Sequence, residues 1–346
     1  MTVNSEMTYE DFFQQWNDSK TDEIQAQTSG STGQPKLILL PKSLMRLSAR
    51  RTIDYFGIDA DWLLGSCLSP RYIGGKMMAV RAAEAGTDFF CVPPSNHPTL
   101  DLALSSGKNT LISVVPSQML HILALPLTKE QKERLHFLVG GSAIPDHLRK
   151  DIVDKGIKAW ESYGMTETAS HIALRAISND SHPFEPLPGI SLSTSDVGTL
   201  IINNWGGERP LITNDLVELT PDGRFQIIGR ADNVIVTGGL KVFPEKLEQK
   251  IRTILTRQYP TLSFSDLMIT SRPDPKWGQA IILLIEADRS NLSSNDLTSK
   301  IHQLIKASPT ILPHEKPKEI LIINNLPRTP NGKLKRKITK THLSQR

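Results

Sequence analysis

Between residues 24 and 161, short apolar runs alternate with segments whose apolar residues recur at helical spacing. Such alternation predicts βα units that build a sheet with helices on its faces. No other feature constrains the fold as strongly, and it predicts an α/β protein. The expected strands span 24–28, 36–40, 63–69, 87–92, 111–115, 135–139 and 157–161, and the expected helices span 8–17, 43–56, 75–85, 99–105, 117–124 and 146–155.

The character of the sequence changes twice further along the chain. After about Ser170, short β runs with Gly, Asn and Pro turns predict a small β subdomain, and after Arg230 a compact α+β unit follows. We therefore expect a large N-terminal α/β domain with mixed sheets, residues 1–231, and a small C-terminal α+β domain, residues 232–346. The expected elements are strands at 172–177, 198–203, 216–219, 225–228, 264–272, 279–287 and 319–323, and helices at 244–257 and 295–306.

Length, cysteines and charge narrow the functional classes. No apolar run approaches the ~18–20 residues of a membrane-spanning helix, and the N-terminus lacks a signal-peptide pattern, so we expect a cytoplasmic protein without membrane insertion. Cys67 and Cys91 lie in apolar runs and are expected to be buried, reduced thiols. The net charge is +4, but six of the Lys and Arg residues lie in the last fourteen positions. Without those fourteen positions, the chain holds 34 basic and 36 acidic residues, so its basic character is confined to the tail. We expect no nucleic-acid partner, while a homo-oligomer is left open.

The strongest local motif is Thr28-Ser-Gly-Ser-Thr-Gly-Gln-Pro-Lys36, which lies between two expected strands. Its glycines and hydroxyl residues would let backbone amides approach a phosphate closely, and Lys36 adds a positive charge. It is not the loop of P-loop NTPases, because its glycines are too close, Pro35 intervenes and a strand follows. An ordinary hairpin turn is the alternative.

Two further motifs directly follow expected strands, where α/β proteins bind ligands. Ser162-Tyr-Gly-Met-Thr-Glu-Thr168 offers the ring of Tyr163 for a base, the hydroxyl of Thr166 for a phosphate and the carboxylate of Glu167 for Mg²⁺. Gly140-Gly-Ser-Ala143 permits close backbone approach. For each motif, a surface turn is the alternative.

Charged residues later in the chain form the last candidates. Asp215, within Thr-Asn-Asp, and Arg230 could hold a ribose diol or form a surface ion pair. Lys333 ends the tail motif Pro327-Arg-Thr-Pro-Asn-Gly-Lys333, where a solvated turn residue is the alternative.

Taken jointly and in this order, the motifs resemble those of the adenylate-forming superfamily of acyl- and aryl-CoA synthetases, firefly luciferase and peptide-synthetase adenylation domains. The matches run from Thr28 to Lys333. The resemblance implies ATP and CoA as co-substrates, Mg²⁺ as cofactor and a mobile C-terminal domain. It implies ATP binding by Thr28, Ser29, Gly30, Ser31, Thr32, Gly33, Gly141, Ser142, Ala143, Tyr163, Gly164, Asp215 and Arg230; catalysis by Lys36, Thr166, Glu167 and Lys333, with Glu167 near the metal; a hinge at Asp232; and a CoA tunnel lined by Gly238 and Gly239.

Two departures from the family pattern accompany this resemblance. The phosphate loop begins at residue 28, which implies that most of the usual first N-terminal subdomain is missing and that the acyl site is smaller. The ribose acid, Asp215, stands in Thr-Asn-Asp rather than the commoner Thr-Gly-Asp.

The segment 68–81 bears on the acid substrate, because the matching stretch lines the acyl site in the family. Basic residues in it suit an acid with a second carboxylate, since a buried anion must be paired. The runs Tyr-Ile-Gly-Gly-Lys-Met-Met and Tyr-Gly-Met-Thr-Glu-Thr-Ala-Ser-His resemble the short o-succinylbenzoate–CoA ligases of menaquinone synthesis. The candidate acyl-site residues are Arg71, Tyr72, Lys76, Ser117, Gln118, His171 and Arg175.

Structural alternatives stay open for several of these residues. Arg71, Lys76 and Arg81 could instead be helix-face charges that point to solvent, and His171 could be a structural histidine with satisfied hydrogen bonds.

The resemblance thus implies an acid–CoA ligase. A carboxylate attacks the α-phosphorus of ATP, which gives acyl-AMP and pyrophosphate, and the CoA thiol then releases AMP. Lys333 is expected to act in the first step and to leave through rotation at Asp232. The alternatives are another aryl- or short-acyl-CoA ligase, an adenylation enzyme that loads a carrier protein, and a regulatory nucleotide-binding protein. The presence of Glu167, Asp215, Arg230 and Lys333 argues against the last.

Overall fold

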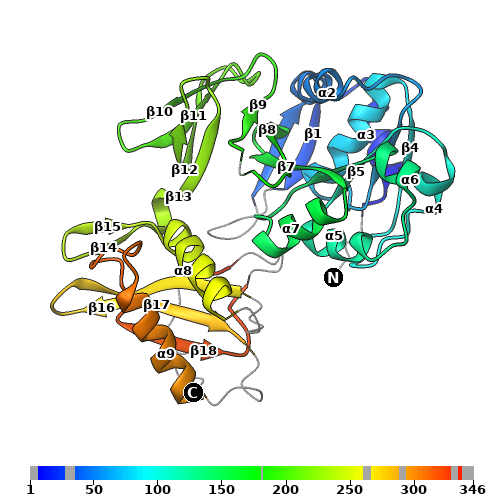
Figure 1. Ribbon diagram of the computed structural model, residues 1–346. Coiled ribbons are helices and arrows are strands. Elements are labelled where there is room, and N and C mark those ends of the chain that lie inside the picture. The colour runs from blue at the N-terminus through cyan, green and yellow to red at the C-terminus, as the bar shows by residue number, and fades with distance from the viewer. Residues whose placement is uncertain are drawn as a thin grey trace, which may run out of the picture. The chain divides into compact units, whose positions relative to one another are not determined.

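The computed structural model describes residues 7–27, 36–180, 182–259, 266–287, 294–328 and 334–336. The chain divides into two compact units (Figure 1). The first comprises Met1–Ser193, Ile201–Leu211 and Leu219–Gln226, and the second comprises Thr194–Leu200, Ile212–Glu218 and Ile227–Arg346.

A seven-stranded mixed sheet, in the order β4-β3-β5-β6-β7-β8-β9, organises the first unit. Neighbours from β4 to β7 run parallel, whereas β8 and β9 are antiparallel to the strands beside them. The predicted α/β fold with mixed sheets is confirmed. The strands are β3 (Leu63–Ser66), β4 (Asp88–Cys91), β5 (Thr110–Val114), β6 (Leu135–Val139), β7 (Lys158–Met165), β8 (Ser170–Ala176) and β9 (Glu185–Pro186).

Helices cover this sheet on both faces, as the alternating pattern predicts (Figure 1). One apolar cluster joins α1 (Tyr9–Asn17), α2 (Lys42–Phe56) and α3 (Ile73–Ala85) to the antiparallel pair β1 (Glu23–Gln27) and β2 (Leu37–Pro41). A second cluster joins strands β3, β5 and β6 to the remaining helices of the unit. These are α4 (Asp101–Ser105), α5 (Pro116–Leu123) and α7 (Asp146–Asp154), and the short α6 (Lys129–Arg134) lies beside β6.

The local sequence explains two of these elements. Helix α1 begins with a capping box in which Thr8 and Asp11 satisfy each other's backbone amides. Helix α3 is buried at every position from Gly75 to Ala82, although Lys76 and Arg81 stand among its small and apolar residues. It is therefore a core helix rather than an amphipathic surface helix.

A four-stranded sheet, in the order β10-β11-β12-β13, contains residues of both units. Its strands confirm the predicted run of short β segments. They are β10 (Ser191–Thr194), β11 (Thr199–Asn203), β12 (Leu211–Leu219) and β13 (Phe225–Arg230), and the short helix η1 (Ala231–Asn233) follows.

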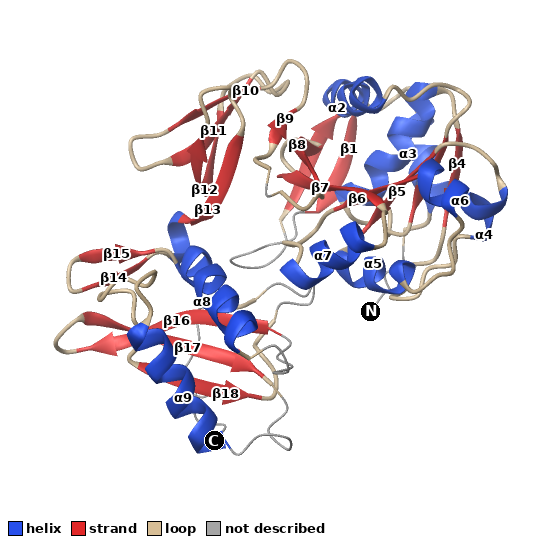
Figure 2. Cartoon of the chain, viewed as in Figure 1, coloured by secondary structure: helices blue, strands red, loops and turns tan. Residues whose placement is uncertain are grey.

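The rest of the second unit is the predicted α+β assembly (Figure 2). Strands β16 (Asp266–Asp274) and β17 (Gly278–Glu286) form a hairpin, and β18 (Glu319–Ile323) pairs with β17 in parallel. Alternate residues of this sheet pack against α8 (Pro244–Gln258) and α9 (Ser294–Ala307). A small hairpin, β14 (Ile235–Thr237) and β15 (Leu240–Val242), precedes α8.

The two cysteines differ in their exposure to solvent. Cys67 is buried as expected, but Cys91 is exposed, so the prediction of two buried thiols is wrong for Cys91. Cys91 ends the short strand β4 at the edge of the sheet, where only one neighbouring strand covers it. Within the described ranges, no helix has both the length and the apolar character needed to cross a bilayer.

Candidate functional site

Four predicted segments meet at one edge of the seven-stranded sheet. Strands β3, β5, β6 and β7 are parallel neighbours, so the loops that follow them leave the sheet at the same edge. Two hydrogen bonds join neighbouring segments at this edge. Gly140 N donates to Val114 O at 3.1 Å, and Gln118 Nε2 donates to Cys67 O at 2.8 Å. The sheet topology therefore gathers segments that lie far apart in the sequence.

Close packing at this edge explains the Gly140-Gly141 pair. A Cβ atom on Gly140 would lie 2.5 Å from Ser162 Oγ, so only glycine fits beside β7. Gly141 has φ +88°, a left-handed conformation that glycine adopts without strain. Ser142 and Ala143 are exposed just beyond it.

The Thr166–Ala169 turn joins β7 to β8 and carries two predicted catalytic residues. Glu167 is exposed in this turn and Thr166 is buried. Thr168 Oγ1 donates to Ser170 O at 2.7 Å, which closes the turn. A Cβ atom on Gly164 would lie 2.2 Å from Ser170 O, so the two strands meet backbone to backbone below the turn.

The aromatic ring predicted to stack on a base lies in an aromatic cluster. Tyr163 is 8% exposed, and its ring centroid lies 5.1 Å from that of Phe225 and 5.9 Å from that of Phe184. Most of the ring surface therefore contacts protein in this structure.

Oxygen donors in the Thr166–Ala169 turn fit a magnesium ion. Glu167 supplies an exposed carboxylate and Thr166 a hydroxyl. No group of three His, Cys, Asp or Glu residues in the described part of the chain could hold a metal alone. Because Mg²⁺ commonly takes one or two carboxylates and completes its shell with phosphates and water, a single carboxylate suffices.

In the second unit, the structure brings Asp215, Arg230 and Asp232 together. Arg230 Nη1 donates to Asp215 Oδ1 at 3.0 Å, and its Nε and Nη2 both donate to the Asp232 carboxylate at 2.9 Å. The hydrogen bonds with Asp232 are the main cause that raises the pKa of Arg230. The predicted hinge residue is thus a direct partner of the predicted ribose-site arginine, which the sequence did not indicate.

The turn between β14 and β15 contains the glycines assigned to the CoA tunnel. Gly238 and Gly239 have φ +56° and +80°, which match a two-residue hairpin turn with left-handed residues. Gly238 N donates to Trp277 O at 2.8 Å, and a Cβ atom on Gly238 would lie 3.0 Å from the Trp277 ring. The hairpin therefore lies directly against the β16–β17 connection.

The candidate acyl-site cations on and before α3 differ in burial. Arg71 is exposed and its Nε donates to Gln27 Oε1 at 3.1 Å, and Tyr72 is also exposed. The solvent-facing alternative is wrong for Lys76 and Arg81, which are each 1% exposed. The Lys76 ammonium group contacts Pro70 O and Met7 Sδ, and burial lowers its pKa to about 8.

The two neutral candidates on α5 already have protein partners. Ser117 is exposed, and its Oγ donates to Asn96 Oδ1 at 3.2 Å. Gln118 is buried, and its Nε2 donates to Cys67 O and to Ser95 O at 2.8 and 2.9 Å. Both amide hydrogens of Gln118 are therefore used within the protein.

Arg175 shares a buried carboxylate with a second arginine. Its Nε donates to Glu161 Oε2 at 3.1 Å, and Arg149 Nη2 donates to the same oxygen at 2.7 Å. The Arg175 guanidinium also lies 4.3 Å from the Phe184 ring centroid.

His171 is buried and both of its ring nitrogens have neighbours. Nε2 lies 2.9 Å from Thr52 Oγ1, and Nδ1 lies 3.3 Å from Arg81 Nη2. Burial, with a smaller contribution from the Arg81 charge, lowers the pKa of His171 well below its usual range. These contacts favour the structural alternative for His171.

Sequence reasoning did not identify Glu161 and left Arg81 out of the candidate site residues, and both are buried charges near this edge. Burial lowers the pKa of Arg81 to about 9. A signal existed for both residues, because Arg81 interrupts an otherwise apolar helix and Glu161 interrupts an expected strand.

The remaining predicted site residues lie at the limits of the described chain. Lys36 is exposed directly before β2. Thr28, Ser29, Gly30, Ser31, Thr32, Gly33 and Lys333 lie outside the described residues.

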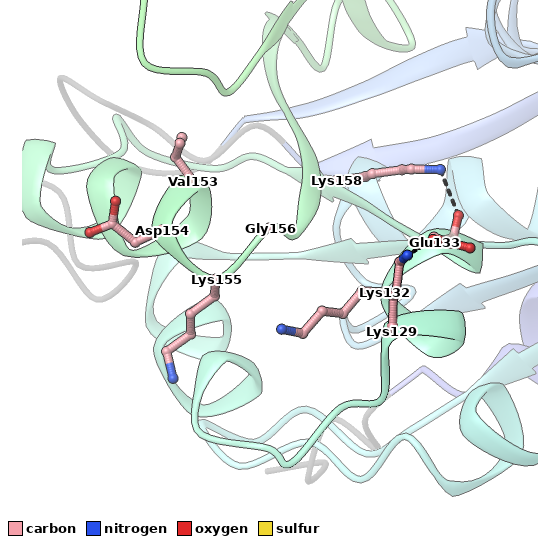
Figure 3. A pocket seen from close by; sticks show the side chains of 8 residues that line it. All are labelled: Lys129, Lys132, Glu133, Val153, Asp154, Lys155, Gly156 and Lys158. Carbon is pink, nitrogen blue, oxygen red and sulfur yellow. Dashed lines mark hydrogen bonds and ion pairs between the residues drawn. The ribbon is translucent and has the colours of Figure 1, made fainter.

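A hollow of about 370 Å³ on the first unit contains none of the predicted site residues (Figure 3). Lys132 and Lys155 are among its lining residues, and Lys132 points into it, while Lys158 Nζ donates to Glu133 O at 2.6 Å. It lies beside α6 and the end of α7 rather than at the edge that gathers the motifs.

Comparisons with known proteins agree with this arrangement. The sequence model of AMP-binding enzymes matches residues 27–212. The chain is similar to 2-succinylbenzoate–CoA ligase of Lactococcus lactis subsp. lactis, with 24% identity over 90% of this chain and 69% of that protein. A crystal structure of an acyl-CoA synthetase (AMP-forming)/AMP-acid ligase II-like protein from Dyadobacter fermentans is 31% identical, with 96% of this chain and 93% of that one covered and a TM-score of 0.59.

The fold recurs in a more distant solved structure. O-succinylbenzoate CoA synthetase of Bacillus subtilis, in complex with ATP and magnesium ion, is 20% identical and superposes with a TM-score of 0.72 over 90% of this chain and 68% of that one. The extent of the family match and the identity to the Dyadobacter protein identify the chain as a member of the AMP-binding enzyme family.

Proposed function

We propose that this protein is an ATP-dependent acid–CoA ligase that converts o-succinylbenzoate to its CoA thioester, a step of menaquinone biosynthesis. The observation that carries the proposal is the name shared by relatives that match about nine-tenths of the chain, 2-succinylbenzoate–CoA ligase, at 24–25% identity. The gathering of the family motifs at one sheet edge supports the same chemistry.

The reaction has two balanced steps. A carboxylate oxygen of the acid attacks the α-phosphorus of ATP, and the bond to pyrophosphate breaks. The CoA thiolate then attacks the acyl carbon, and AMP leaves as the thioester forms. The first step needs cationic groups where charge develops, and the second needs the thiol to reach the acyl carbon.

Specific residues of this chain are assigned to these needs. Asp215, held by Arg230, accepts hydrogen bonds from the ribose hydroxyls. Lys36 and Lys333 supply positive charge to the phosphates, and Thr166 and Glu167 would hold Mg²⁺. When bound, Mg²⁺ neutralises charge on the phosphate oxygens.

A panel of acids tests the proposal. ATP–pyrophosphate exchange is measured with o-succinylbenzoate, benzoate and phenylacetate, and AMP release is then measured with and without CoA. We expect saturable exchange with o-succinylbenzoate and AMP release that requires CoA. Exchange with none of the acids contradicts adenylation of aromatic acids, and exchange without CoA-dependent release points to an enzyme that loads a carrier protein.

A variant of Lys333 tests its assignment. Lys333→Ala should lower exchange by about 10²-fold, the usual size for one transition-state charge contact. Thioester formation from preformed acyl-AMP should persist. Lys335→Ala is the matched control, because Lys335 is exposed two residues further on. Equal loss in both half-reactions would contradict a role confined to adenylation.

An aromatic acid with a single carboxylate is the second candidate substrate. Arg175 is paired with Glu161, and both amide hydrogens of Gln118 are used within the protein. Fewer donors are therefore available for a second carboxylate than the sequence suggests. Preference for benzoate or phenylacetate in the panel would select this candidate.

A further inference from the structure

We infer that Arg81 is a positioning residue which, together with Ser48 and His171, fixes the turn that presents Thr166 and Glu167. The inference rests on the proposed function, since it assigns a role within the same adenylation site. It concerns the backbone just after the catalytic turn, where α2 and α3 both reach β8.

The Thr166–Ala169 turn ends in an unusual backbone conformation. Ala169 has φ +50° and Ser170 has φ +90°. Among the described residues other than glycine, Asn204 alone shares a positive φ with them. Such residues are strained and persist only where their surroundings hold them, often at functional sites.

Two helices hold this strained pair. Ser48 Oγ on α2 donates to Ala169 O at 2.8 Å, and this contact is buried. Arg81 Nη2 on α3 donates to Ser170 Oγ at 3.4 Å. The backbone that follows Glu167 is therefore fixed by side chains more than eighty residues away in the sequence.

The contacts of Arg81 continue through His171 back to α2. Because His171 is neutral, its Nδ1 accepts from Arg81 Nη2 and its protonated Nε2 donates to Thr52 Oγ1. The Thr52 hydroxyl then donates to Ser48 O at 3.3 Å. A closed chain of hydrogen bonds thus links the two residues that grip Ala169 and Ser170.

Stability alone does not explain Arg81. Its side chain is 1% exposed. Among the described residues it has no carboxylate partner, and its buried Nε has no hydrogen-bond partner there. A buried cation without an anion is unfavourable, and an apolar residue of similar size would be tolerated as well or better. Arg81 is therefore expected to serve the geometry of the site at the expense of stability.

Arg81→Met is the decisive variant, with Arg50→Met as its matched control. Arg50 lies on the exposed side of α2 and pairs with Glu84 at 3.3 Å. We expect Arg81→Met to unfold at the same or a higher temperature, while kcat of ATP–pyrophosphate exchange falls about 10–100-fold, because small displacements of catalytic groups have effects of this size. The KM for the acid should stay within about twofold.

The inference has outcomes that would overturn it. A selective rise in the acid KM would make Arg81 a substrate contact, and a fall in kcat that matches a loss of thermal stability would make it a core residue only. Ser170→Gly provides a second route, because glycine adopts the positive φ without strain. We expect higher thermal stability with lower kcat for this variant, and an unchanged kcat would also overturn the inference.

Failure of the inference differs from failure of the proposed function. Wild-type protein that exchanges normally beside an equally active Arg81→Met variant rejects the inference alone. Wild-type protein that shows no exchange with any acid rejects the proposed function, and the role of Arg81 in adenylation with it.

Discussion

Arg175 lies on β8 and Arg81 contacts β8 from α3, but the electrostatic surroundings of the two side chains differ. Arg175 contacts Glu161, whose carboxylate also accepts from Arg149, so each of these two guanidinium groups has an acid beside it. Arg81 contacts a serine, a neutral histidine and a methionine sulfur, and it forms no ion pair with an acid in the part of the chain that the structure describes. The difference indicates that the Glu161 cluster stabilises the fold, whereas Arg81 is kept in place for the turn beside it.

The largest loss of stability is expected when the carboxylate that pairs with Arg175 is removed. Glu161→Gln leaves two partly buried guanidinium groups facing a neutral amide, so the free energy of unfolding should fall by roughly 3–5 kcal/mol. Urea denaturation measures the loss. Asp154→Asn, which breaks the exposed pair with Lys150, is the control and should leave stability nearly unchanged, because solvent screens this pair. Similar losses in both variants would remove the distinction drawn for Arg175.

Gly164→Ala should disturb the His171 end of the hairpin and spare the Glu161 end. The new Cβ atom would lie 2.2 Å from Ser170 O, and overpacking of this kind destabilises by roughly 2–3 kcal/mol. Gly164 pairs with His171, whereas Glu161 pairs with Arg175 beyond a register shift. Hydrogen exchange should therefore quicken near residue 171 more than near residue 175, and uniform quickening would contradict this.

The pH dependence of stability tests whether His171, which contacts Arg81, is held neutral in the folded state. The pKa of His171 is lowered in the folded state, so below about pH 6.5 the unfolded chain binds a proton that the folded chain does not. Between pH 7 and pH 5 stability should therefore fall, and the unfolded pKa limits the contribution of this residue to at most about 2 kcal/mol. The difference between wild type and His171→Gln, measured by urea denaturation across this range, gives the contribution. Parallel pH profiles would show that the imidazole is not held neutral.

Lys76→Met tests a second buried cation, which contacts Pro70 O and Met7 Sδ and has no carboxylate partner within the described ranges. The variant should raise the free energy of unfolding by about 1 kcal/mol at pH 7. At this pH Lys76 is charged in both the folded and the unfolded chain, but only the folded chain pays the desolvation of a buried charge. The folded pKa is about 8, so the gain should shrink as the pH rises from 8 towards 10. Thermal unfolding at pH 7 and pH 10 checks this, and lower stability at pH 7 would contradict it.

The sequence predicted the order of elements well because their periodicity is local. The expected strand 135–139 matches β6 (Leu135–Val139), and most other bounds differ by a few residues. Helix α6 was missed because it is six residues long and buries none of them, although Thr128 and Gln131 form a capping box at its start. Short elements of this kind give little periodic signal.

The side-chain environment at the site was less predictable. A helix that is buried on all sides has no polar face to reveal where Arg81 points, so its burial depends on β8, far away in the sequence. Likewise, the pairing of Arg175 with Glu161 follows from strand register. Motif order indicated which segments meet, whereas tertiary packing decides which charges are compensated.

The strand order of the seven-stranded sheet also has a consequence for biosynthesis. In a chain that emerges from its N-terminus, β3 and β4 can pair first, and β5, β6, β7 and β8 then join one side in sequence. At about 5–20 residues per second, translation separates β3 from β8 by on the order of ten seconds. Arg81 lacks its hydrogen bonds with Ser170 and His171 until β8 arrives. These two contacts therefore form only when the sixth of the seven strands joins the sheet, before β9 is added, and we expect nascent chains that stop before residue 170 to leave Arg81 more accessible to solvent.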